Sequence, residues 1–145
     1  MSQDILLACA DCGARNRVLV ERLAHAVNCG KCKHVLVVPG HPVELDDTTF
    51  DAVIAGSQRG VLVDFWAEWC GPCKAFAPVL ERFAKRHAID ILVAKVNVDA
   101  AQAVAAKHQV SSIPTLCIFR GGQEVVRRVG GMSLPELEQM VRAAG

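Results

Sequence analysis

From residue 43 onward, hydrophobic positions alternate between strand-like and helix-like spacing. β-Branched and apolar runs predict strands at 43–45, 61–65, 91–98, 115–119 and 124–129. Between them, and after the last one, apolar positions recur as in amphipathic helices, and these predicted helices follow Asp47, Cys70, Ala100 and Ser133. The strand–helix–strand order predicts a parallel pair with a right-handed crossover, and the last two strands predict an antiparallel hairpin. The fold class is therefore α/β, with a mixed central sheet flanked by helices on both sides.

Two local signals mark where helices begin. Asp46 or Asp47 can cap a helix whose apolar positions include Phe50 and Val53. Ser133 and Glu136 have the spacing of a capping box in front of the last helix.

The first forty residues have a different pattern. Short apolar stretches at 5–8, 15–20, 25–27 and 35–38 predict a small β ribbon, which is too small to hold itself together by its core alone. Pro39-Gly40-His41-Pro42 then breaks the pattern, because two prolines and a glycine favour a turn. We therefore expect three parts: a ribbon at 1–38, a linker at 39–42 and a second domain at 43–145.

Composition narrows the partners and the compartment. The chain has 145 residues, 52% of them hydrophobic, and a formal charge of +1. Residues 1–42 carry five Lys or Arg against three Asp or Glu, so no strong positive field favours nucleic acid. No stretch approaches the roughly 18 apolar residues of a membrane span, and the start lacks the basic and apolar regions of a signal peptide. We expect a cytoplasmic protein with neither a nucleic-acid nor a membrane partner.

Four of the seven cysteines form two pairs, Cys9-x-x-Cys12 and Cys29-x-x-Cys32. Structural disulfides are rare in a reducing compartment, whereas this spacing is typical of zinc sites. Gly13 and Gly30 supply flexible backbone for the two turns. Four thiolates complete a tetrahedral Zn²⁺ shell, so the site is predicted to be structural and to hold one ion. Two disulfides, an iron–sulfur centre and a second redox pair remain as alternatives.

The other chemical motif is Trp69-Cys70-Gly71-Pro72-Cys73, at the point where a buried strand gives way to a helix. The first turn of a helix offers unpaired N–H groups and the positive end of the macrodipole, and both favour a thiolate. Cys70 is therefore the predicted nucleophile. Cys73 lies one turn further on and can form a disulfide with it, while Pro72 is tolerated near a helix start.

These residues resemble the active site of the thioredoxins. The resemblance runs from about residue 43 to the end and includes Asp64, Pro78, Lys95, the 112–115 segment and the 129–131 segment. The cysteine-rich extension is similar to that of zinc-containing bacterial thioredoxins. The resemblance implies a protein-disulfide reductase with a redox-active Cys70–Cys73 disulfide. It also implies disulfide-containing client proteins and re-reduction by an NADPH-dependent thioredoxin reductase.

Further site residues follow from the sequence and the resemblance together. Asp64 lies inside a buried strand, so its pKa should be raised, and it is expected to exchange a proton with Cys73. Lys95 in the neighbouring strand is a candidate partner for Asp64; either side chain could instead point to solvent at a strand end. The resemblance implies a cis-proline facing the disulfide. The predicted substrate-binding residues are Trp69, Gly71, Pro72, Ile113, Pro114 and Gly130.

Two rival functions remain open from sequence. An oxidase or isomerase is a rival activity, although Gly-Pro between the cysteines resembles the reducing members of the family. A zinc-dependent, redox-regulated chaperone or binding module is a rival of another class.

Trp66 is predicted to be core, and Cys117, which alternates within an apolar strand, is predicted to be a buried thiol rather than a regulatory one.

Overall fold

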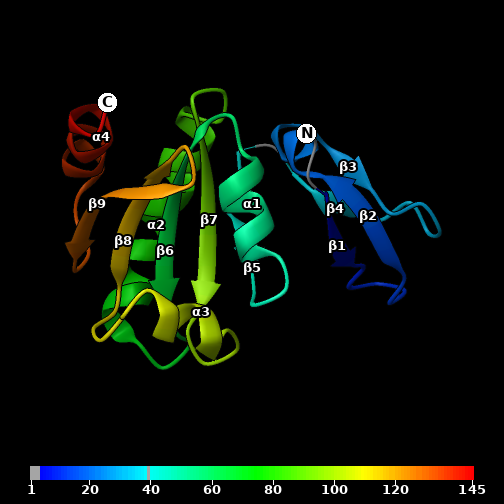
Figure 1. Ribbon diagram of the computed structural model, residues 1–145, viewed down its shortest axis with the longest axis horizontal. Coiled ribbons are helices and arrows are strands. Elements are labelled where there is room, and N and C mark those ends of the chain that lie inside the picture. Colours follow the sequence, from blue (N-terminus) through cyan, green and yellow to red (C-terminus); the bar gives the residue numbers. More distant parts are fainter. Residues whose placement is uncertain (1–3, 39) are drawn as a thin grey trace.

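The computed structural model describes residues 4–38 and 40–145. Two predicted regions therefore lie partly outside the described residues: the linker, which includes Pro39, and the ribbon, which includes residues 1–3. Two small antiparallel sheets make up the N-terminal region, which lies at one end of the molecule in Figure 1. Their strands are β1 (Asp4–Ala8) with β2 (Arg15–Leu19), and β3 (Val27–Asn28) with β4 (Val35–Val37). The predicted β ribbon is confirmed.

One element of the ribbon differs from the prediction. A 3₁₀ helix, η1 (Val20–Ala24), follows β2 where the pattern predicted the end of one strand and the approach to the next. Val20 and Leu23 are both buried because residues three apart lie on the same side of a 3₁₀ helix. His25 was expected in a strand, but its N–H instead donates to the carbonyl of Arg22 at the end of η1.

The main sheet has five strands in the order β5-β7-β6-β8-β9. They are β5 (Val43–Leu45), β6 (Gly60–Trp66), β7 (Ile91–Asn97), β8 (Thr115–Arg120) and β9 (Gln123–Val129). Strands β5 and β6 each pair with β7 in parallel, whereas β8 is antiparallel to β6 and to β9. The mixed sheet and its C-terminal hairpin are as predicted.

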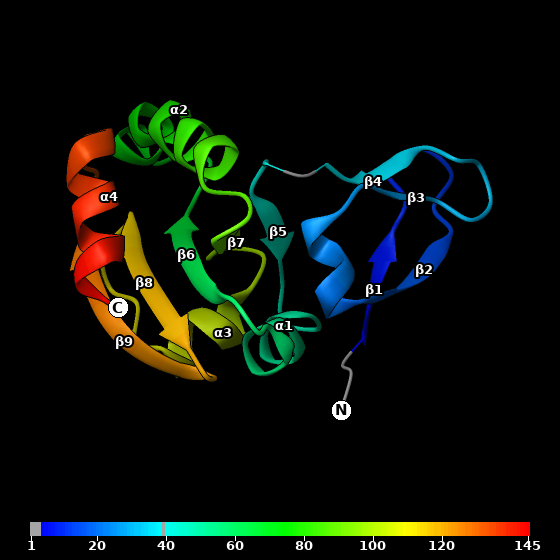
Figure 2. The same cartoon turned by 90° about the horizontal axis from the view of Figure 1, so that it is seen from above.

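Helices cover both faces of this sheet. They are α1 (Phe50–Gly56), α2 (Gly71–Arg86), α3 (Gln102–Lys107) and α4 (Leu134–Ala143). In Figure 2, α2 and α4 lie on one side of the sheet and α1 and α3 on the other. Within the described ranges, no helix is long and apolar enough to cross a membrane.

Side chains of β6 alternate between these two layers. Val61, Val63 and Phe65 belong to the apolar cluster on the α1 side, whereas Leu62 belongs to the cluster formed with α2 and α4. Because alternate residues of a strand share a face, Asp64 lies on the α2 side with Leu62. The strand thus directs the one acidic residue in its sequence toward the layer that carries the cysteine pair.

The two capping signals had different outcomes. The Ser133 hydroxyl accepts from the N–H of Glu136, and the Glu136 carboxylate accepts from the N–H of Ser133, so the predicted capping box is present. Thr49, not an aspartate, is the cap residue of α1. The Asp46 carboxylate accepts N–H bonds in the turn just before it, and Asp47 accepts from the N–H of Val104 at 2.9 Å, in the first turn of α3.

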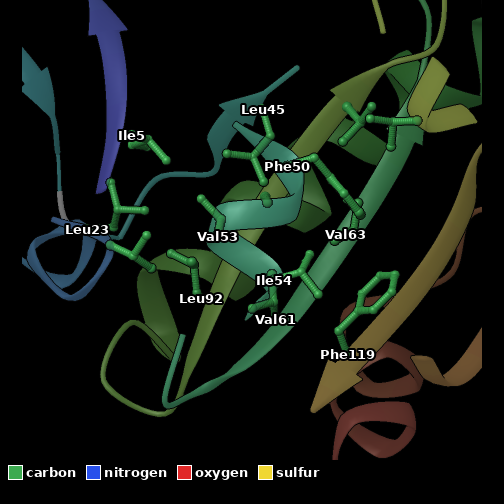
Figure 3. Close-up of a cluster of buried hydrophobic side chains, with 14 of the residues drawn as sticks. Ile5, Leu23, Leu45, Phe50, Val53, Ile54, Val61, Val63, Leu92 and Phe119 are labelled. Atoms are coloured by element: carbon green, nitrogen blue, oxygen red, sulfur yellow. The ribbon is translucent and has the colours of Figure 1, made fainter. Parts of the chain in front are cut away.

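The ribbon and the main domain share one hydrophobic cluster. Figure 3 shows Ile5 and Leu23 of the ribbon beside Val53 of α1 and Leu92 of β7. Ile5 and Leu23 are 4% and 3% exposed, and Val53 is fully buried. The outer side of α1 is therefore covered by the ribbon rather than by water.

Candidate active site

Cys70 and Cys73 form a disulfide at the N-terminus of α2. Cys70 is the cap residue of this helix, and its sulfur accepts from the N–H of Cys73 at 3.1 Å. Cys70 is 4% exposed and Cys73 3%, so in the disulfide form burial does not distinguish the two sulfurs. Position does: a negative charge on the Cys70 sulfur would be stabilised by this N–H and by the helix dipole.

The loop between α3 and β8 lies against the disulfide. The Cys70 sulfur is 3.8 Å from the carbonyl oxygen of Ile113, whose side chain packs against the buried cluster that contains both cysteines. The bond between Ile113 and Pro114 is cis, as the resemblance implied. The N–H of Gly130 donates to the carbonyl of Pro114 at 2.7 Å, which ties the end of β9 to this loop.

Trp69 provides the apolar rim beside the disulfide. Its side chain is 70% exposed, and its indole N–H donates to the Asp99 carboxylate at 2.8 Å. Gly71 and Pro72 occupy the first two positions of α2. The structure thus brings all six predicted substrate-binding residues to the end of the molecule that holds the disulfide.

Asp64 is a carboxyl group in an almost dry environment. Its residue is 1% exposed, and one carboxylate oxygen, Oδ1, has no hydrogen-bond partner among the described residues. Burial raises the pKa of Asp64 to about 7; Lys95 lowers it and Glu44 raises it, both to a smaller extent. A carboxyl group with this pKa can change its charge near neutral pH, which a proton-transfer group requires.

Lys95 does not form the expected ion pair with Asp64 in the described part of the chain. The two residues are direct neighbours in the β6–β7 register, but the Lys95 ammonium lies over the Trp66 ring, 4.2 Å from its centroid. The indole N–H of Trp66 donates to the Glu44 carboxylate at 3.2 Å. Trp66 is half-buried and packs against the cluster that contains Cys70 and Cys73, so its prediction as core is correct only in part. The aromatic ring competes with Asp64 for the ammonium.

The four ribbon cysteines converge on one point. All four sulfur atoms lie within 4.8 Å of one another; Cys9 and Cys32 are 3.5 Å apart, and Cys12 and Cys29 are 3.7 Å apart. Sulfurs held about 2.3 Å from a central zinc ion in a tetrahedron are separated by roughly 3.8 Å. None of the four is in a disulfide. The cluster therefore has the donor atoms and the spacing of a closed metal site.

Comparison with known proteins identifies the family. The Thioredoxin family model matches residues 41–143. Thioredoxin C-3 of Corynebacterium nephridii is 42% identical over 135 residues, which cover 93% of this chain and 92% of that protein. The chain belongs to the thioredoxin family. It is a thiol-disulfide oxidoreductase.

Other relatives match a smaller share of this thioredoxin. The thioredoxin of Mycobacterium bovis is 50% identical over 88 residues, which cover 61% of the chain and 76% of that protein. The bifunctional thioredoxin reductase/thioredoxin of Mycobacterium leprae is 50% identical over 91 residues, which cover 63% of the chain and 20% of that protein.

The turns around the ribbon cysteines use one predicted glycine and not the other. Gly13, directly after Cys12, has a φ of 76°. The equivalent position after Cys32 is Lys33, with a φ of 69°, while Gly30 has no positive φ. Gly30 instead donates its N–H to the side-chain oxygen of Asn16, whose amide also donates to the Cys29 sulfur at 3.5 Å. Asn16 was not predicted as a site residue, because an Asn in a short strand is usually a solvated side chain.

Cys117 is fully buried, as predicted. It lies on the α1 side of β8, in the same cluster as Phe119. Burial raises the pKa of its thiol to about 12, with a smaller contribution from Glu124. A thiol with so little thiolate character and no access to solvent reacts slowly with oxidants.

Proposed function

We propose that this thioredoxin is a protein-disulfide reductase in which Cys70 attacks and Cys73 resolves. The observation that carries the proposal is the position of Cys70 as the cap residue of α2, with the Cys73 N–H directed at its sulfur. This arrangement stabilises a thiolate on Cys70 in preference to one on Cys73.

The reaction proceeds through two thiol–disulfide exchanges. The Cys70 thiolate attacks one sulfur of the client disulfide, a bond forms between them, and the other client sulfur leaves as a thiolate and takes up a proton. Cys73 then attacks the Cys70 sulfur and releases the second client thiolate. The client gains two electrons and two protons, and the enzyme is left with the Cys70–Cys73 disulfide.

Asp64 accepts the proton that Cys73 must lose before the second exchange. Its location on the α2 side of β6 and its raised pKa support this role. Lys95 adjusts the charge balance at Asp64 from the neighbouring strand without an ion pair. The substrate-binding surface consists of the exposed Trp69 together with Gly71, Pro72, Ile113, Pro114 and Gly130.

The electrons come from an NADPH-dependent thioredoxin reductase. The Mycobacterium leprae relative is named for a reductase and a thioredoxin in one chain, which supports such a pairing here. The working compartment is the cytoplasm, where thiols such as those of the ribbon stay reduced.

The ribbon, residues 1–38, binds one Zn²⁺ through Cys9, Cys12, Cys29 and Cys32. The all-sulfur donor set and the spacing of the four atoms support zinc, and a full set of protein ligands leaves no position for water or substrate. The ion would hold the two Cys turns of the ribbon together; no step of disulfide exchange involves it.

A trapping experiment tests the assignment of the two active-site cysteines. The Cys73→Ser variant should form the mixed disulfide but not resolve it, because a serine hydroxyl is not acidic enough to displace a sulfur at neutral pH. Clients should then accumulate in mixed disulfides with Cys70. Dithiothreitol should release them, and the Cys70→Ser, Cys73→Ser double variant should capture none. Clients recovered on the ribbon cysteines would overturn the assignment. Insulin reduction that survives Cys70→Ser would favour the rival function, a zinc-dependent, redox-regulated chaperone or binding module.

A further inference from the structure

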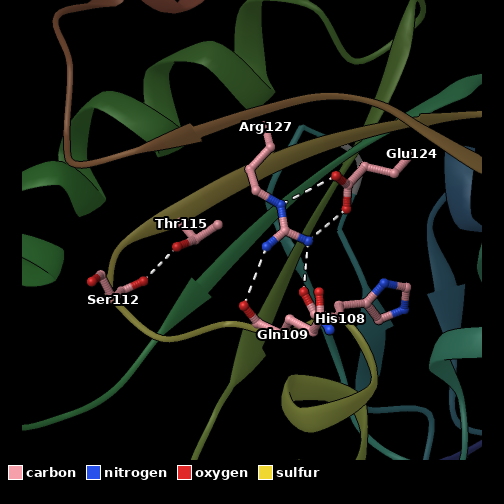
Figure 4. Close-up of polar contacts among 6 residues, drawn as sticks. All are labelled: His108, Gln109, Ser112, Thr115, Glu124 and Arg127. Atoms are coloured by element: carbon pink, nitrogen blue, oxygen red, sulfur yellow. Dashed lines mark hydrogen bonds and ion pairs between the residues drawn. The ribbon is translucent and has the colours of Figure 1, made fainter.

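Arg127 of β9 makes several polar contacts that the disulfide exchange proposed above does not explain. Its guanidinium binds the Glu124 carboxylate through two N–H groups, at 3.1 Å from Nε and 2.7 Å from Nη2. The same Nη2 donates to the carbonyl of His108 at 2.6 Å, and Nη1 donates to the carbonyl of Gln109 at 3.4 Å. Figure 4 shows the guanidinium between the carboxylate and the two carbonyls.

These carbonyls lie at the end of α3, where helix geometry leaves carbonyl groups without partners. Gln109 follows directly and has a φ of 54°, a left-handed conformation that is unfavourable for a residue with a side chain. The His108 ring packs between Phe50 and Phe119, with ring centroids 5.1 and 5.5 Å away. The chain is therefore fixed at this point on one side by aromatic packing and on the other by Arg127.

The segment that begins here leads directly to the disulfide. Only Val110, Ser111 and Ser112 separate Gln109 from Ile113, whose carbonyl lies 3.8 Å from the Cys70 sulfur. The far end of the segment is held by two other bonds, from the Thr115 hydroxyl to the Ser112 carbonyl and from the Gly130 N–H to the Pro114 carbonyl. Ser111 and Ser112 are exposed, so the position of the segment depends on how its two ends are held.

We infer that Arg127, oriented by Glu124, is a positioning residue that sets the location of the 110–114 segment against client polypeptides. The inference rests on the proposed function, in which this segment binds the client. Arg127 touches no reacting atom. It fixes the start of the segment from β9, just as Gly130, directly after the same strand, fixes its end.

The effect should depend on the size of the substrate. A protein disulfide must place its flanking chain along Ile113, whereas a small aromatic disulfide needs only the Cys70 sulfur. Displacement of the segment should therefore weaken client binding and leave the chemistry of Cys70 unchanged, which is the pattern expected when binding rather than transition-state interactions are lost.

The chain offers a matched control, because Arg128 is next to Arg127 in β9 but exposed, and its side chain takes part in no ion pair or hydrogen bond with the described residues. We would compare wild type, Arg127→Gln and Arg128→Gln, each zinc-loaded and reduced, in insulin reduction with dithiothreitol and in single-turnover reaction with 5,5′-dithiobis(2-nitrobenzoate). Arg127→Gln should raise the KM for insulin about three- to tenfold, with kcat and the small-disulfide rate within about twofold of wild type. Arg128→Gln should match wild type in the insulin KM, in kcat and in the small-disulfide rate.

Arg127→Lys separates positioning from charge, because lysine keeps the charge but cannot bind a carboxylate bidentately while reaching two carbonyls. The insulin KM of Arg127→Lys should therefore lie between that of wild type and that of Arg127→Gln. The inference is wrong if Arg127→Gln and Arg128→Gln give the same insulin KM, if Arg127→Lys restores it fully, or if the small-disulfide rate falls as much as insulin reduction. Failure of the proposed function would look different, since wild type itself would then not reduce insulin.

Discussion

Replacing Asp64 with asparagine should stabilise the protein at pH values above about 4, and the effect should be largest above neutral. The Asp64 pKa is about 7 in the folded protein, raised by burial from an ordinary value of 3.8. Each tenfold change in an acid equilibrium is worth about 1.4 kcal/mol, so the charged carboxylate is about 4 kcal/mol less favourable in the folded state than in the unfolded chain. Asparagine has nearly the same shape and never carries that charge.

The sign of the pH dependence follows from proton binding. Between about pH 4 and pH 7 the folded protein holds a proton on Asp64 that the unfolded chain has lost. The stability contributed by this group therefore falls as the pH rises through that window, and the loss is complete above about 7. Wild type and Asp64→Asn should have similar stability at pH 4 and differ by up to about 4 kcal/mol at pH 9.

Urea unfolding of the oxidised, zinc-loaded proteins at pH 4 and pH 9 measures this directly. With a denaturant dependence of about 2 kcal/mol per molar urea, the midpoint of Asp64→Asn should exceed that of wild type by roughly 2 M at pH 9 and by little at pH 4. Glu68→Gln removes an exposed acid nearby in the chain and serves as the control, with no pH-dependent difference expected. A difference between Asp64→Asn and wild type that is the same at both pH values would refute the reasoning, because it would not come from the charge.

Three further predictions follow from other parts of the structure. In the reduced protein, Cys70 should be alkylated with an apparent pKa below the unperturbed value of about 8.5 and below that of Cys73, as pH-dependent iodoacetamide kinetics can test; identical profiles for the two thiols would contradict their proposed roles. Removing zinc with a chelator, or deleting residues 1–40, should lower the thermal midpoint of residues 43–145 as well, because Ile5 and Leu23 cover Val53; an unchanged midpoint would show that the parts are independent. Asp47→Ala should destabilise the protein by about 1 kcal/mol through loss of the α3 contact, whereas Asp51→Ala, which breaks only an exposed ion pair with Lys107, should cost less than about 0.5 kcal/mol.

Local patterns predicted the parts of this fold that depend on neighbours in sequence. The Ser133–Glu136 capping box is correct because both partners lie within one helical turn. The strand containing Asp64 and the helix after Cys70 are correct because their apolar spacing is distinctive over many residues.

The incorrect predictions involve competition between partners that are distant in sequence. Asp47 has the residue type of a helix cap, but the N–H groups that it binds belong to α3, more than fifty positions away. Lys95 is adjacent to Asp64 in the sheet, but its ammonium group lies over the Trp66 ring instead of pairing with the Asp64 carboxylate. A sequence pattern identifies a capping acid or a cation and does not say which of several partners lies nearest.

The candidate site likewise includes residues that could be located from sequence and residues that could not. The two Cys pairs and the Trp-Cys-Gly-Pro-Cys motif could be located from spacing alone, since cysteine chemistry limits the alternatives. Asn16 beside Cys29, and Arg127 at the end of α3, could not, because an Asn or Arg in a strand is usually a solvated side chain and only the fold shows what it contacts.

The contact between the ribbon and α1 has a consequence for comparisons among relatives. In a chain without the ribbon, the side of α1 that meets Ile5 and Leu23 would face water, and large apolar residues there would no longer be favoured. Across many aligned sequences, the presence of the two Cys pairs should therefore correlate with apolar residues at the positions of Val53 and Leu92. Substitutions at Leu23 and Val53 should compensate each other in volume, so this statistical coupling would reveal the packed interface even in relatives whose structures are unknown.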